Sequence, residues 1–375
     1  MLSYWEQQSF INYDHVVIGS GIVGLSTAIE LKVKYPKSSV LVLERSLLPT
    51  GASSRNAGFV CMGSLTELLD DLQYSSEQEV VALYDLRRKG LLKLRERLGD
   101  DKIGYKANGS YELLNEHELE ALDRLDDINA LLKDITRQTA FSLANEKIEE
   151  FGFSEEYTKA LIKNNCEGEL HTGKMLRALI DYAMMMGVEI KTGANVQRFY
   201  EHAAQVDVVL DDAVRGELIL SAGKLFVCTN AFTKQLLPGE DVIPGRGQVL
   251  ITEPVKDLRF KGVYHFDKGY YYFREIDGRV LFGGGRNKDF TGETTTALEL
   301  NDLIQNDLAQ KLAEIILPDT PFVIEQRWSG IMAFGANKQP IVKQVSNNIY
   351  GAFRMGGMGV AIGSEVGAQL VNLLP

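Results

Sequence analysis

Residues 14–44 read DHVVIGSGIVGLSTAIELKVKYPKSSVLVLE, and this stretch decides the fold. The run from Asp14 to Ser20 is short, apolar and rich in β-branched residues, which predicts a buried strand. Apolar residues at helical spacing follow in residues 25–36 and predict a helix that stops near Pro36. Residues 39–44 predict a second buried strand, so the order is strand, glycine-rich turn, helix, strand.

The turn between this strand and helix has the spacing of a dinucleotide-binding site. Gly19 permits a tight turn, Gly21 lets the backbone approach a pyrophosphate, and Gly24 lets helix and sheet pack closely. The helix N-terminus offers unpaired N–H groups to the phosphates. Glu44 would accept hydrogen bonds from a ribose diol and would repel a 2′-phosphate, which disfavours NADP; the neighbouring Arg45 weakens that last argument. The residues predicted to contact the cofactor here are Gly19, Ser20, Gly21, Ile22, Val23, Gly24, Glu44 and Arg45.

The turn alone leaves FAD and NAD open, and two observations favour FAD. The sequence contains no second such turn with its own strand–helix–strand unit, and a loop of small residues, not another α/β repeat, follows the second strand. That loop, LPTGASSRNAGFV at residues 48–60, is either a polar surface loop or a segment that packs small side chains against a planar ring.

A second glycine-rich turn lies near the other end of the sequence. The predicted strand YGAFRM, residues 350–355, leads into Gly356-Gly357-Met358-Gly359 and then a predicted helix. Reduced flavin carries negative charge near N1 and the C2 carbonyl, and a helix N-terminus aimed there would stabilise that charge. The alternative is a structural strand-to-helix turn.

Several segments together resemble one known family. They are GSGIVGLSTAIEL (19–31), Glu44-Arg45, GASSRNAGF (51–59), HTGKMLRALIDYAMMMGVEI (171–190), KLFVCTNAFT (224–233), RWSGIMAFGANKQPIV (327–342) and YGAFRMGGMGVAIG (350–363). In this order they are similar to the FAD-dependent D-amino acid oxidase superfamily, within it to the glycine oxidase, sarcosine oxidase and γ-glutamylputrescine oxidase branch. The likeness covers the FAD-binding part well and the substrate-binding part poorly.

The resemblance implies an α/β fold, with a Rossmann-like FAD-binding domain and an inserted mixed-sheet α+β substrate domain. We expect residues 1–105, 165–240 and 327–375 in the FAD-binding domain, and residues 106–164 and 241–326 in the substrate domain. We expect FAD to be bound without a covalent link. Further cofactor contacts are expected at Ala52, Ser53, Ser54, Arg55, Asn56, Ala57, Gly58, Val196, Thr229, Asn230, Gly330, Arg354, Gly356, Gly357, Met358, Gly359 and Val360.

The expected second domain has its own sequence pattern. Residues 244–290 alternate between apolar and polar side chains, which predicts an antiparallel sheet with hairpin turns at residues 267–269 and at Asp277-Gly278. Residues 294–317 predict a helix.

The reaction implied by the resemblance is oxidation of a C–N bond in an amine or amino acid, with hydride transfer to flavin N5 and an imine as the first product. In the α-amino acid members an arginine pairs with the substrate carboxylate, and Met332 stands at that position here. We therefore expect Tyr270, Tyr272 and Arg286 to border the substrate pocket, or else to be stacked aromatics and a surface arginine. Lys338 either lies near the flavin or is an exposed lysine.

Other functions remain open from the residues. They are a flavin-dependent dehydrogenase of a hydroxy acid, a nicotinamide-dependent dehydrogenase, and a flavin-binding module without catalysis. The acceptor of the electrons could be oxygen or a carrier. The histidines at positions 15, 171 and 265 fit packed or surface residues better than catalytic bases.

Net charge, cysteine content and hydropathy limit the classes of partner and the compartment that we expect. The 375 residues carry a net charge of -11, which argues against nucleic-acid binding. Cys61, Cys166 and Cys228 are an odd, widely spaced set, typical of a reducing compartment, and no pair has metal-ligand spacing, so we expect no metal. We expect Cys61 and Cys228 to be buried and inert. No signal segment or membrane span is apparent, which favours a cytoplasmic protein.

Overall fold

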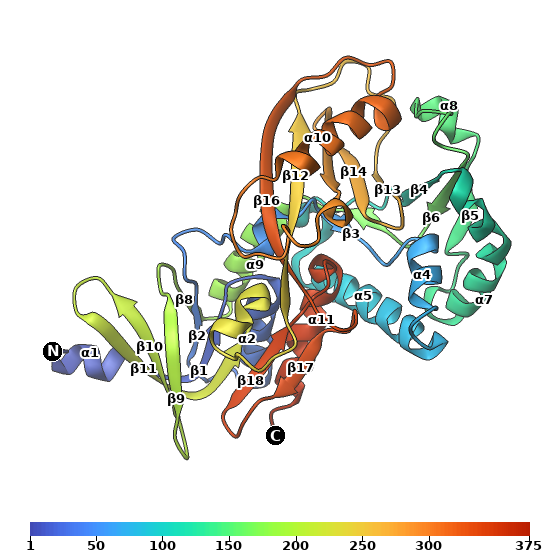
Figure 1. Cartoon of the computed structure of the whole chain (residues 1–375). Helices are drawn as coiled ribbons and strands as arrows, with labels where there is room; N and C mark the ends of the chain where they lie inside the picture. The colour runs from blue at the N-terminus through green and yellow to red at the C-terminus, as the bar shows by residue number, and fades with distance from the viewer.

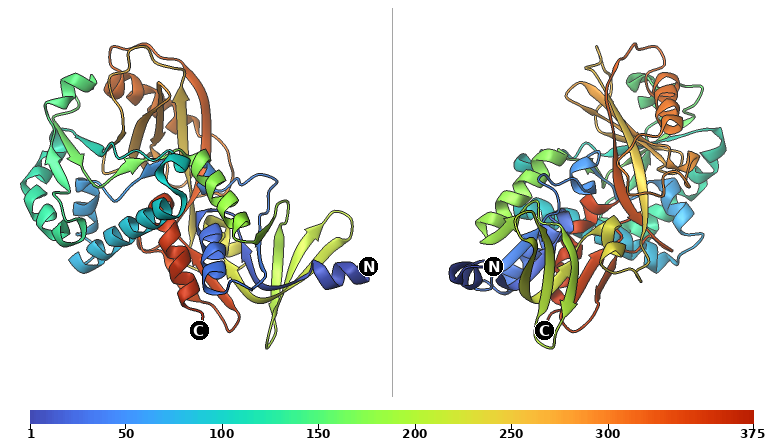
Figure 2. Two further views of the ribbon diagram at one scale, coloured as in Figure 1. Left: turned by 180° about the vertical axis from the view of Figure 1, so that it is seen from behind. Right: turned by 60° about the vertical axis from the view of Figure 1, so that its left-hand side comes forward.

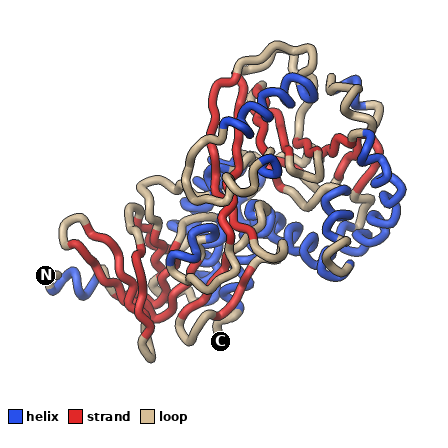
Figure 3. The backbone as a smooth tube through the Cα atoms, in the orientation of Figure 1, coloured by secondary structure: helices blue, strands red, loops and turns tan.

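The computed structural model describes residues 1–375, and most of its strands belong to two eight-stranded sheets. The first sheet fills the lower part of Figure 1 and the second the upper part, and they appear as two groups of red strands in Figure 3. The first sheet contains β1 (Asn12–Ile18), β2 (Val40–Leu43), β8 (Val188–Lys191), β9 (Val196–Glu201), β10 (Val206–Asp212), β11 (Gly216–Val227), β17 (Ile341–Gln344) and β18 (Ile349–Phe353).

The centre of the first sheet is parallel, in the order β18-β11-β1-β2-β8. Successive side chains of β1 enter two different cores: Val17 packs with the helices, whereas Val16 and Ile18 pack with β9, β10 and their neighbours. A parallel strand that is buried on both faces needs a nearly continuous apolar run, and VVI in β1 and VLVL in β2 supply it. The predicted strand–turn–helix–strand order is confirmed.

Helices cover the face of the first sheet that is turned away in Figure 1. Figure 2 shows α2 (blue), α9 (green) and α11 (red) on that side, where α11 packs against both α2 and α5. The α-helices are α1 (Tyr4–Ser9), α2 (Ile22–Lys34), α3 (Ala52–Arg55), α4 (Leu65–Asp71), α5 (Glu77–Leu98), α6 (Asp100–Ile103), α7 (Leu125–Thr136), α8 (Lys147–Phe151), α9 (Thr172–Met185), α10 (Asp302–Lys311) and α11 (Gly359–Asn372). Shorter turns of 3₁₀ or π helix are η1 (Glu116–Arg124), η2 (Asn230–Gln235), η3 (Arg286–Lys288) and η4 (Leu312–Ile316). No helix combines the length and the apolar character that crossing a membrane requires.

The second sheet is mixed, in the order β16-β12-β15-β14-β13-β4-β6-β5. Only β13 and β4 run parallel to each other; all other neighbours in it are antiparallel. Its strands are β4 (Ser110–Leu114), β5 (Phe141–Leu143), β6 (Ala160–Asn164), β12 (Ile243–Thr252), β13 (Val263–Phe266), β14 (Tyr271–Ile276), β15 (Arg279–Gly284) and β16 (Ile324–Phe334), and a separate pair is formed by β3 (Phe59–Val60) and β7 (Gly168–Glu169).

The two predicted hairpin turns are confirmed. Asp277 and Gly278 both have positive φ, at 51° and 74°, which suits a two-residue turn between β14 and β15. Residues 267–269 join β13 to β14 in the same left-handed region.

Two sequence expectations concern element boundaries. The helix predicted over residues 294–317 begins only at Asp302, because the side chain of Asn301 accepts a hydrogen bond from the Leu303 N–H (3.1 Å) and caps it there. Strand β16 spans the domain boundary expected at residue 327 and pairs along its length with β12 in the second sheet; the domain limits themselves stay a prediction.

Candidate functional site

A cavity of about 530 Å³ lies where the two sheets meet. One wall is formed at the carboxyl ends of parallel strands of the first sheet, near Ile18, Leu43 and Cys228, which is where α/β sheets bind their ligands. The opposite wall comes from the second sheet and includes Tyr272 and Met332. The cavity therefore joins the region predicted for a cofactor to the region predicted for a substrate.

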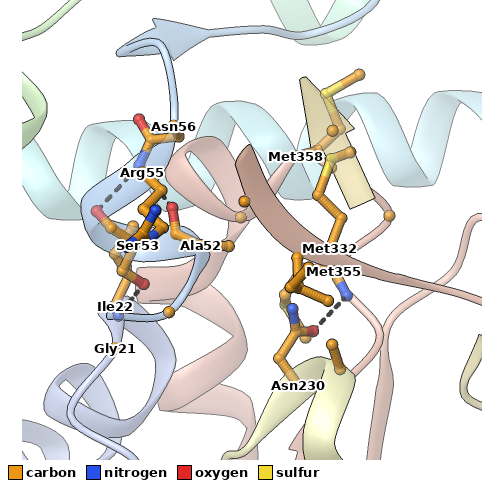
Figure 4. A pocket seen from close by; sticks show the side chains of 18 of the residues that line it. Gly21, Ile22, Ala52, Ser53, Arg55, Asn56, Asn230, Met332, Met355 and Met358 are labelled. Carbon is orange, nitrogen blue, oxygen red and sulfur yellow. Dashed lines mark hydrogen bonds between the residues drawn. The ribbon is translucent and has the colours of Figure 1, made fainter. Parts of the chain in front are cut away.

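The first glycine turn has no room for side chains. Gly19 has φ of 105°, and a Cβ on it would lie 2.7 Å from the Cys228 carbonyl oxygen. A Cβ on Gly24 would lie 1.9 Å from the Gly19 oxygen, so the helix can approach the turn only without one. At Gly21 a Cβ would meet the Ser53 Oγ at 2.9 Å, and this hydroxyl accepts a hydrogen bond from the Ile22 N–H, drawn in Figure 4. This bare backbone at the start of α2 fits the diphosphate of a dinucleotide.

Glu44 and Arg45 lie at one end of the cavity. The buried Glu44 carboxylate accepts hydrogen bonds from the Ser20 N–H (3.2 Å) and hydroxyl (2.7 Å), so it is held in place at the cavity wall. The Arg45 guanidinium stacks on the Phe232 ring at 3.6 Å from its centroid. A flat cation–aromatic pair beside a fixed carboxylate suits the adenosine part of a dinucleotide.

The loop at residues 48–60 lines the cavity and is hydrogen-bonded to the second sheet. The alternative of a polar surface loop is therefore wrong. Arg55 donates to the Ser329 carbonyl (2.9 Å), and the Trp328 indole N–H donates to the Arg55 carbonyl (3.1 Å). Asn56 donates to the carbonyls of Ala52 and Ser53, as Figure 4 shows for part of this loop. These bonds fix a strip of small residues along the cavity.

The second glycine turn faces the same cavity from the start of α11. Gly356 and Gly357 have positive φ of 56° and 82°. The Asn230 side-chain oxygen accepts hydrogen bonds from the N–H groups of Arg354 (3.1 Å) and Met355 (3.2 Å), and the second bond is visible in Figure 4. The turn is thus held open at the N-terminus of a long helix, which fits the electron-rich edge of a flavin.

The structure brings most of the predicted residues to the cavity wall. Those that line it are Gly19, Gly21, Ile22, Val23, Glu44, Arg45, Ala52, Ser53, Arg55, Asn56, Ala57, Val196, Thr229, Asn230, Tyr270, Tyr272, Arg286, Gly330, Gly356, Gly357, Met358, Gly359 and Val360. Ser20, Gly24, Ser54, Gly58 and Arg354 are not among the lining residues. The hydroxyl of Ser54 turns back to the Pro49 carbonyl (2.6 Å), and the Arg354 guanidinium is ion-paired with Asp241, so both side chains serve the local structure.

Some cavity residues were not found by sequence reasoning. Phe232 and Leu236 belong to or follow the irregular helix η2, and Met355 follows β18. Phe232 and Met355 lie within segments quoted for the family resemblance, but nothing in those segments singled them out as contacts, so only the tertiary fold places them at the cavity. The same is true of Glu67 and Asp70 on α4, which reach the cavity from a helix that carries no motif.

The second-sheet wall carries two tyrosines and a methionine. Tyr270 is 41% exposed at the cavity mouth, whereas Tyr272 on β14 is deeper, and burial raises the pKa of its hydroxyl to about 12. The sulfur of Met332 lies against the α11 turn, 3.5 Å from where a Gly357 Cβ would be. Met332 therefore fills the space between the second glycine turn and the second sheet.

Three positively charged side chains lie near this wall, and two of them are ion-paired with carboxylates. Lys338 pairs with Asp71 (2.6 Å) and Glu67 (3.1 Å), and Lys268 pairs with Asp70 (3.1 Å). Arg286 instead lies over two aromatic rings, Phe334 at 4.1 Å and Phe290 at 5.0 Å.

Cys61, His265 and Glu167 form a cluster at the cavity wall that sequence reasoning missed. The expectation that Cys61 is buried holds only in part, because it is partly buried and lines the cavity together with His265. Its Sγ lies 3.6 Å from His265 Nε2, and Glu167 Oε2 lies 3.5 Å from the same nitrogen. Burial raises the pKa of the Cys61 thiol; it would lower the pKa of His265, but the facing Cys61 and Glu167 groups raise that pKa well above its ordinary value.

Comparisons with known proteins found similar sequences and solved structures of similar fold. A chain described as probable oxidoreductase OrdL, from Haemophilus influenzae, is 23% identical over 365 residues, which cover 93% of this chain and 80% of that protein. The crystal structure of L-proline dehydrogenase from P. horikoshii superposes with a TM-score of 0.77 at 19% identity, covering 97% of this chain and 93% of that one. Glycine oxidase from Geobacillus kaustophilus gives a TM-score of 0.75 at 20% identity, with 97% and 95% covered.

These structural likenesses establish the fold, and the two-part architecture expected from the sequence is confirmed. A family model described as FAD dependent oxidoreductase matches residues 14–373, nearly the whole chain. The cofactor is FAD, and the nicotinamide alternative is set aside. The chain therefore belongs to the FAD dependent oxidoreductase family and is an enzyme of that kind.

Proposed function

We propose that the enzyme oxidises the C–N bond of an amino acid or a related amine that carries a carboxylate, giving an imine that water hydrolyses. The observation that supports this most is the state of Arg286. It is the guanidinium on the second-sheet wall that has no carboxylate partner, and its Nε has no hydrogen-bond partner.

Arg286 has the burial and the charge of an anion-binding residue. It is half-buried, and burial lowers the pKa of its guanidinium, yet an arginine remains charged at any physiological pH. A cation that has lost part of its water without gaining a counter-ion costs free energy, which a substrate carboxylate would recover. Its planar fork suits a two-point hydrogen bond to that carboxylate.

The aromatic frame around Arg286 fixes its position. Phe290 and Phe334 hold the guanidinium plane, and Gly245 leaves it room, since a Cβ there would lie 2.9 Å from the Arg286 Nε. We infer that Arg286 takes the place of the arginine that Met332 replaces. Holding the carboxylate from residue 286, which follows β15, and not from residue 332 on β16, shifts where the reacting carbon lies.

The other wall residues complete the proposed substrate site. The Tyr272 hydroxyl, protonated because its pKa is raised to about 12, is a hydrogen-bond donor to the substrate. Phe59 packs edge-on against Tyr272 (5.4 Å between ring centroids), and Met332 adds an apolar surface, so the substrate would meet a largely apolar wall between the sheets. Tyr270 stands at the mouth as the residue that the substrate passes.

When bound, FAD supplies the two-electron acceptor, which takes the hydride at N5. The chain contributes by positioning: Arg286 and Tyr272 hold the substrate from one wall, while the turns at Gly19–Gly24 and Gly356–Gly359 hold the cofactor on the other. On this proposal the second sheet, β16 included, and its covering helices form the substrate domain, and FAD is held without a covalent bond.

A hydroxy acid is the competing substrate class, because its carboxylate would suit Arg286 equally well. The test is to mix the yellow enzyme anaerobically with matched pairs, such as an amino acid and its 2-hydroxy analogue, and to follow loss of the visible flavin absorbance. We expect bleaching by amino acids, with ammonia and an oxo acid formed. Bleaching by the hydroxy acids alone, or by amines without a carboxylate equally well, would contradict the proposal.

The same preparation separates the two classes of electron acceptor. An oxygen electrode run with the best substrate registers oxygen uptake for an oxidase, whereas a dehydrogenase turns over only with an added quinone or dye. The acceptor is thereby assigned without altering the conclusion on the substrate.

A further inference from the structure

Cys61, His265 and Glu167 offer three different donor atoms that converge on one point of the cavity wall. The Sγ, the Nε2 and a carboxylate oxygen all lie within 4.8 Å of one another. They come from three separate segments: Cys61 follows β3, Glu167 precedes β7, and His265 lies on β13 of the second sheet. The cluster thus exists only because the two halves of the molecule meet here.

The arrangement differs from a nucleophile–histidine–acid relay. In such a relay the nucleophile and the acid bind opposite nitrogens of the imidazole ring. Here Cys61 Sγ (3.6 Å) and Glu167 Oε2 (3.5 Å) both face the same nitrogen, Nε2. Three donors around one point, not a chain of donors, suit the binding of a cation between them.

The distances match a particular kind of cation. For tetrahedral zinc, with bonds of about 2.3 Å to sulfur and about 2.0–2.2 Å to nitrogen and oxygen, ligand atoms lie about 3.5 Å apart for S···N and about 3.4 Å for N···O. The separations in the cluster, 3.6 Å and 3.5 Å, are close to both values. Thiolate, imidazole and carboxylate are also the donor types that Zn²⁺ uses in proteins.

The surroundings of Glu167 add to the indication of a ligand. Its side chain is 1% exposed, and its Oε2 has no hydrogen-bond partner, although its Oε1 accepts two, from the N–H groups of Met62 (2.6 Å) and Gly63 (2.9 Å). This oxygen faces His265 Nε2 at 3.5 Å, a long ion pair that leaves the buried carboxylate short of a full hydrogen bond, and a cation between the two atoms would supply the missing interaction. Phe59 packs edge-on against the His265 ring (5.5 Å between centroids) and holds the imidazole in place.

We propose that Cys61, His265 and Glu167 bind a Zn²⁺ ion, with one coordination position open towards the cavity. Cys61 and His265 line the cavity whereas Glu167 lies behind them, so the open position faces the substrate side. Binding requires that the thiol proton of Cys61 and any proton on His265 Nε2 leave to solvent. The fourth ligand is then water, or an amine or carboxylate of a molecule in the cavity.

The experiment uses the full chain with FAD bound, dialysed against a chelator and then equilibrated with Zn²⁺ alone. Metal analysis after removal of free ion is expected to give one Zn²⁺ per chain. X-ray absorption at the zinc edge is expected to show a single sulfur at about 2.3 Å and nitrogen or oxygen ligands at about 2.0–2.2 Å. Neither readout depends on enzyme activity.

Variants separate this site from adventitious binding. Cys61→Ser is expected to weaken Zn²⁺ binding by at least about 100-fold, because even outer partners of metal ligands account for about 10–100-fold. Cys166→Ser is the matched control, since Cys166 is a thiol outside the cavity lining and should leave the affinity unchanged. Glu167→Gln is a second ligand variant; retained flavin and an unchanged melting temperature in Cys61→Ser show that loss of metal is not loss of fold.

Three results would overturn the proposal. They are less than about one tenth of a Zn²⁺ per chain at micromolar free metal, equal affinity in Cys61→Ser and Cys166→Ser, and an absorption spectrum without sulfur. Any of them leaves the cluster as a buried hydrogen-bonded group on the cavity wall.

Discussion

On the first sheet the cavity is bounded by two turns, Gly19–Gly24 and Gly356–Gly359, whereas on the second sheet it is bounded by side chains such as Tyr272, Arg286 and Met332. The first wall works through backbone N–H groups and helix N-termini, for which the absence of a side chain is the requirement. The second wall would bind its ligand through the charge and shape of side chains, which many residue types can supply. This difference explains why sequence motifs predict the cofactor but do not identify the substrate.

The second wall also depends on a side-chain network for its stability. Glu293 is fully buried and accepts hydrogen bonds from Arg246 (2.7 Å) and Gln248 (3.0 Å), both on β12 beneath the wall. Burial would raise the pKa of Glu293, but the bonds from Arg246, Gln248 and Asn301 outweigh it and hold the pKa below 4.5. The first wall has a smaller contact of this kind, in which the Glu44 carboxylate accepts hydrogen bonds from the Ser20 N–H and hydroxyl.

The largest expected effect tests that network. Glu293→Gln should lower the free energy of unfolding at pH 7 by about 3–5 kcal/mol, because it leaves Arg246 buried without its partner. Since the folded-state pKa is depressed, the stabilisation by Glu293 is present above its unfolded pKa and is lost as the pH falls through the folded one. Denaturant unfolding should therefore show the gap between wild type and variant narrowing below about pH 4.5; a gap independent of pH would contradict this account.

The next effect tests the backbone wall. Gly19→Ala should destabilise the holoenzyme by about 2–5 kcal/mol, from a side chain forced into positive φ and from its clash with the Cys228 carbonyl. Flavin content and thermal unfolding measure it.

Gly51→Ala is the matched control for this substitution. Gly51 also lines the cavity and also precedes a helix, but its φ is -76° and no atom lies within 4 Å of its Cβ position. It should retain FAD and change stability by less than about 0.5 kcal/mol. Similar losses of FAD and of stability in both variants would show that the lack of space at Gly19 is not what the cofactor site requires.

A smaller effect tests the charge on the second wall. Arg286→Gln should reduce kcat/KM for a carboxylate-bearing amine by about 100-fold, mainly through KM, because a half-buried, charge-assisted pair with the substrate carboxylate is lost. Arg279→Gln, an arginine on β15 paired with Glu325 at the surface, should change kcat/KM by less than about 2-fold. If the two variants behave alike, Arg286 is not the carboxylate partner.

The smallest effect concerns Tyr272. Tyr272→Phe should cost about 10-fold in kcat/KM, the value of about one hydrogen bond in a partly closed site. Because the pKa of Tyr272 is about 12, its hydroxyl stays protonated at lower pH. The ratio of wild type to variant should therefore be constant between about pH 6 and pH 10, and a ratio that falls towards pH 10 would indicate an ionising tyrosine.

The sequence led to the cofactor wall but only partly to the substrate wall. Gly19, Gly21, Glu44 and the 48–60 loop could be placed because strand, turn and helix follow one another along the chain. Arg286 and Tyr272 could be suggested from alternation along a strand. Glu67, Cys61 and His265 could not be recognised as neighbours, because they lie on three elements whose approach no local pattern encodes.

What the sequence determined by itself was the local order: an apolar strand, a turn that tolerates no side chain, a helix and an acidic strand end, which bind a dinucleotide through the backbone. What only the tertiary structure decided was which side chains face that backbone across the cavity. Periodicity is a property of a few neighbouring residues, whereas the meeting of β13, β16 and α4 with the first sheet depends on the packing of the whole chain.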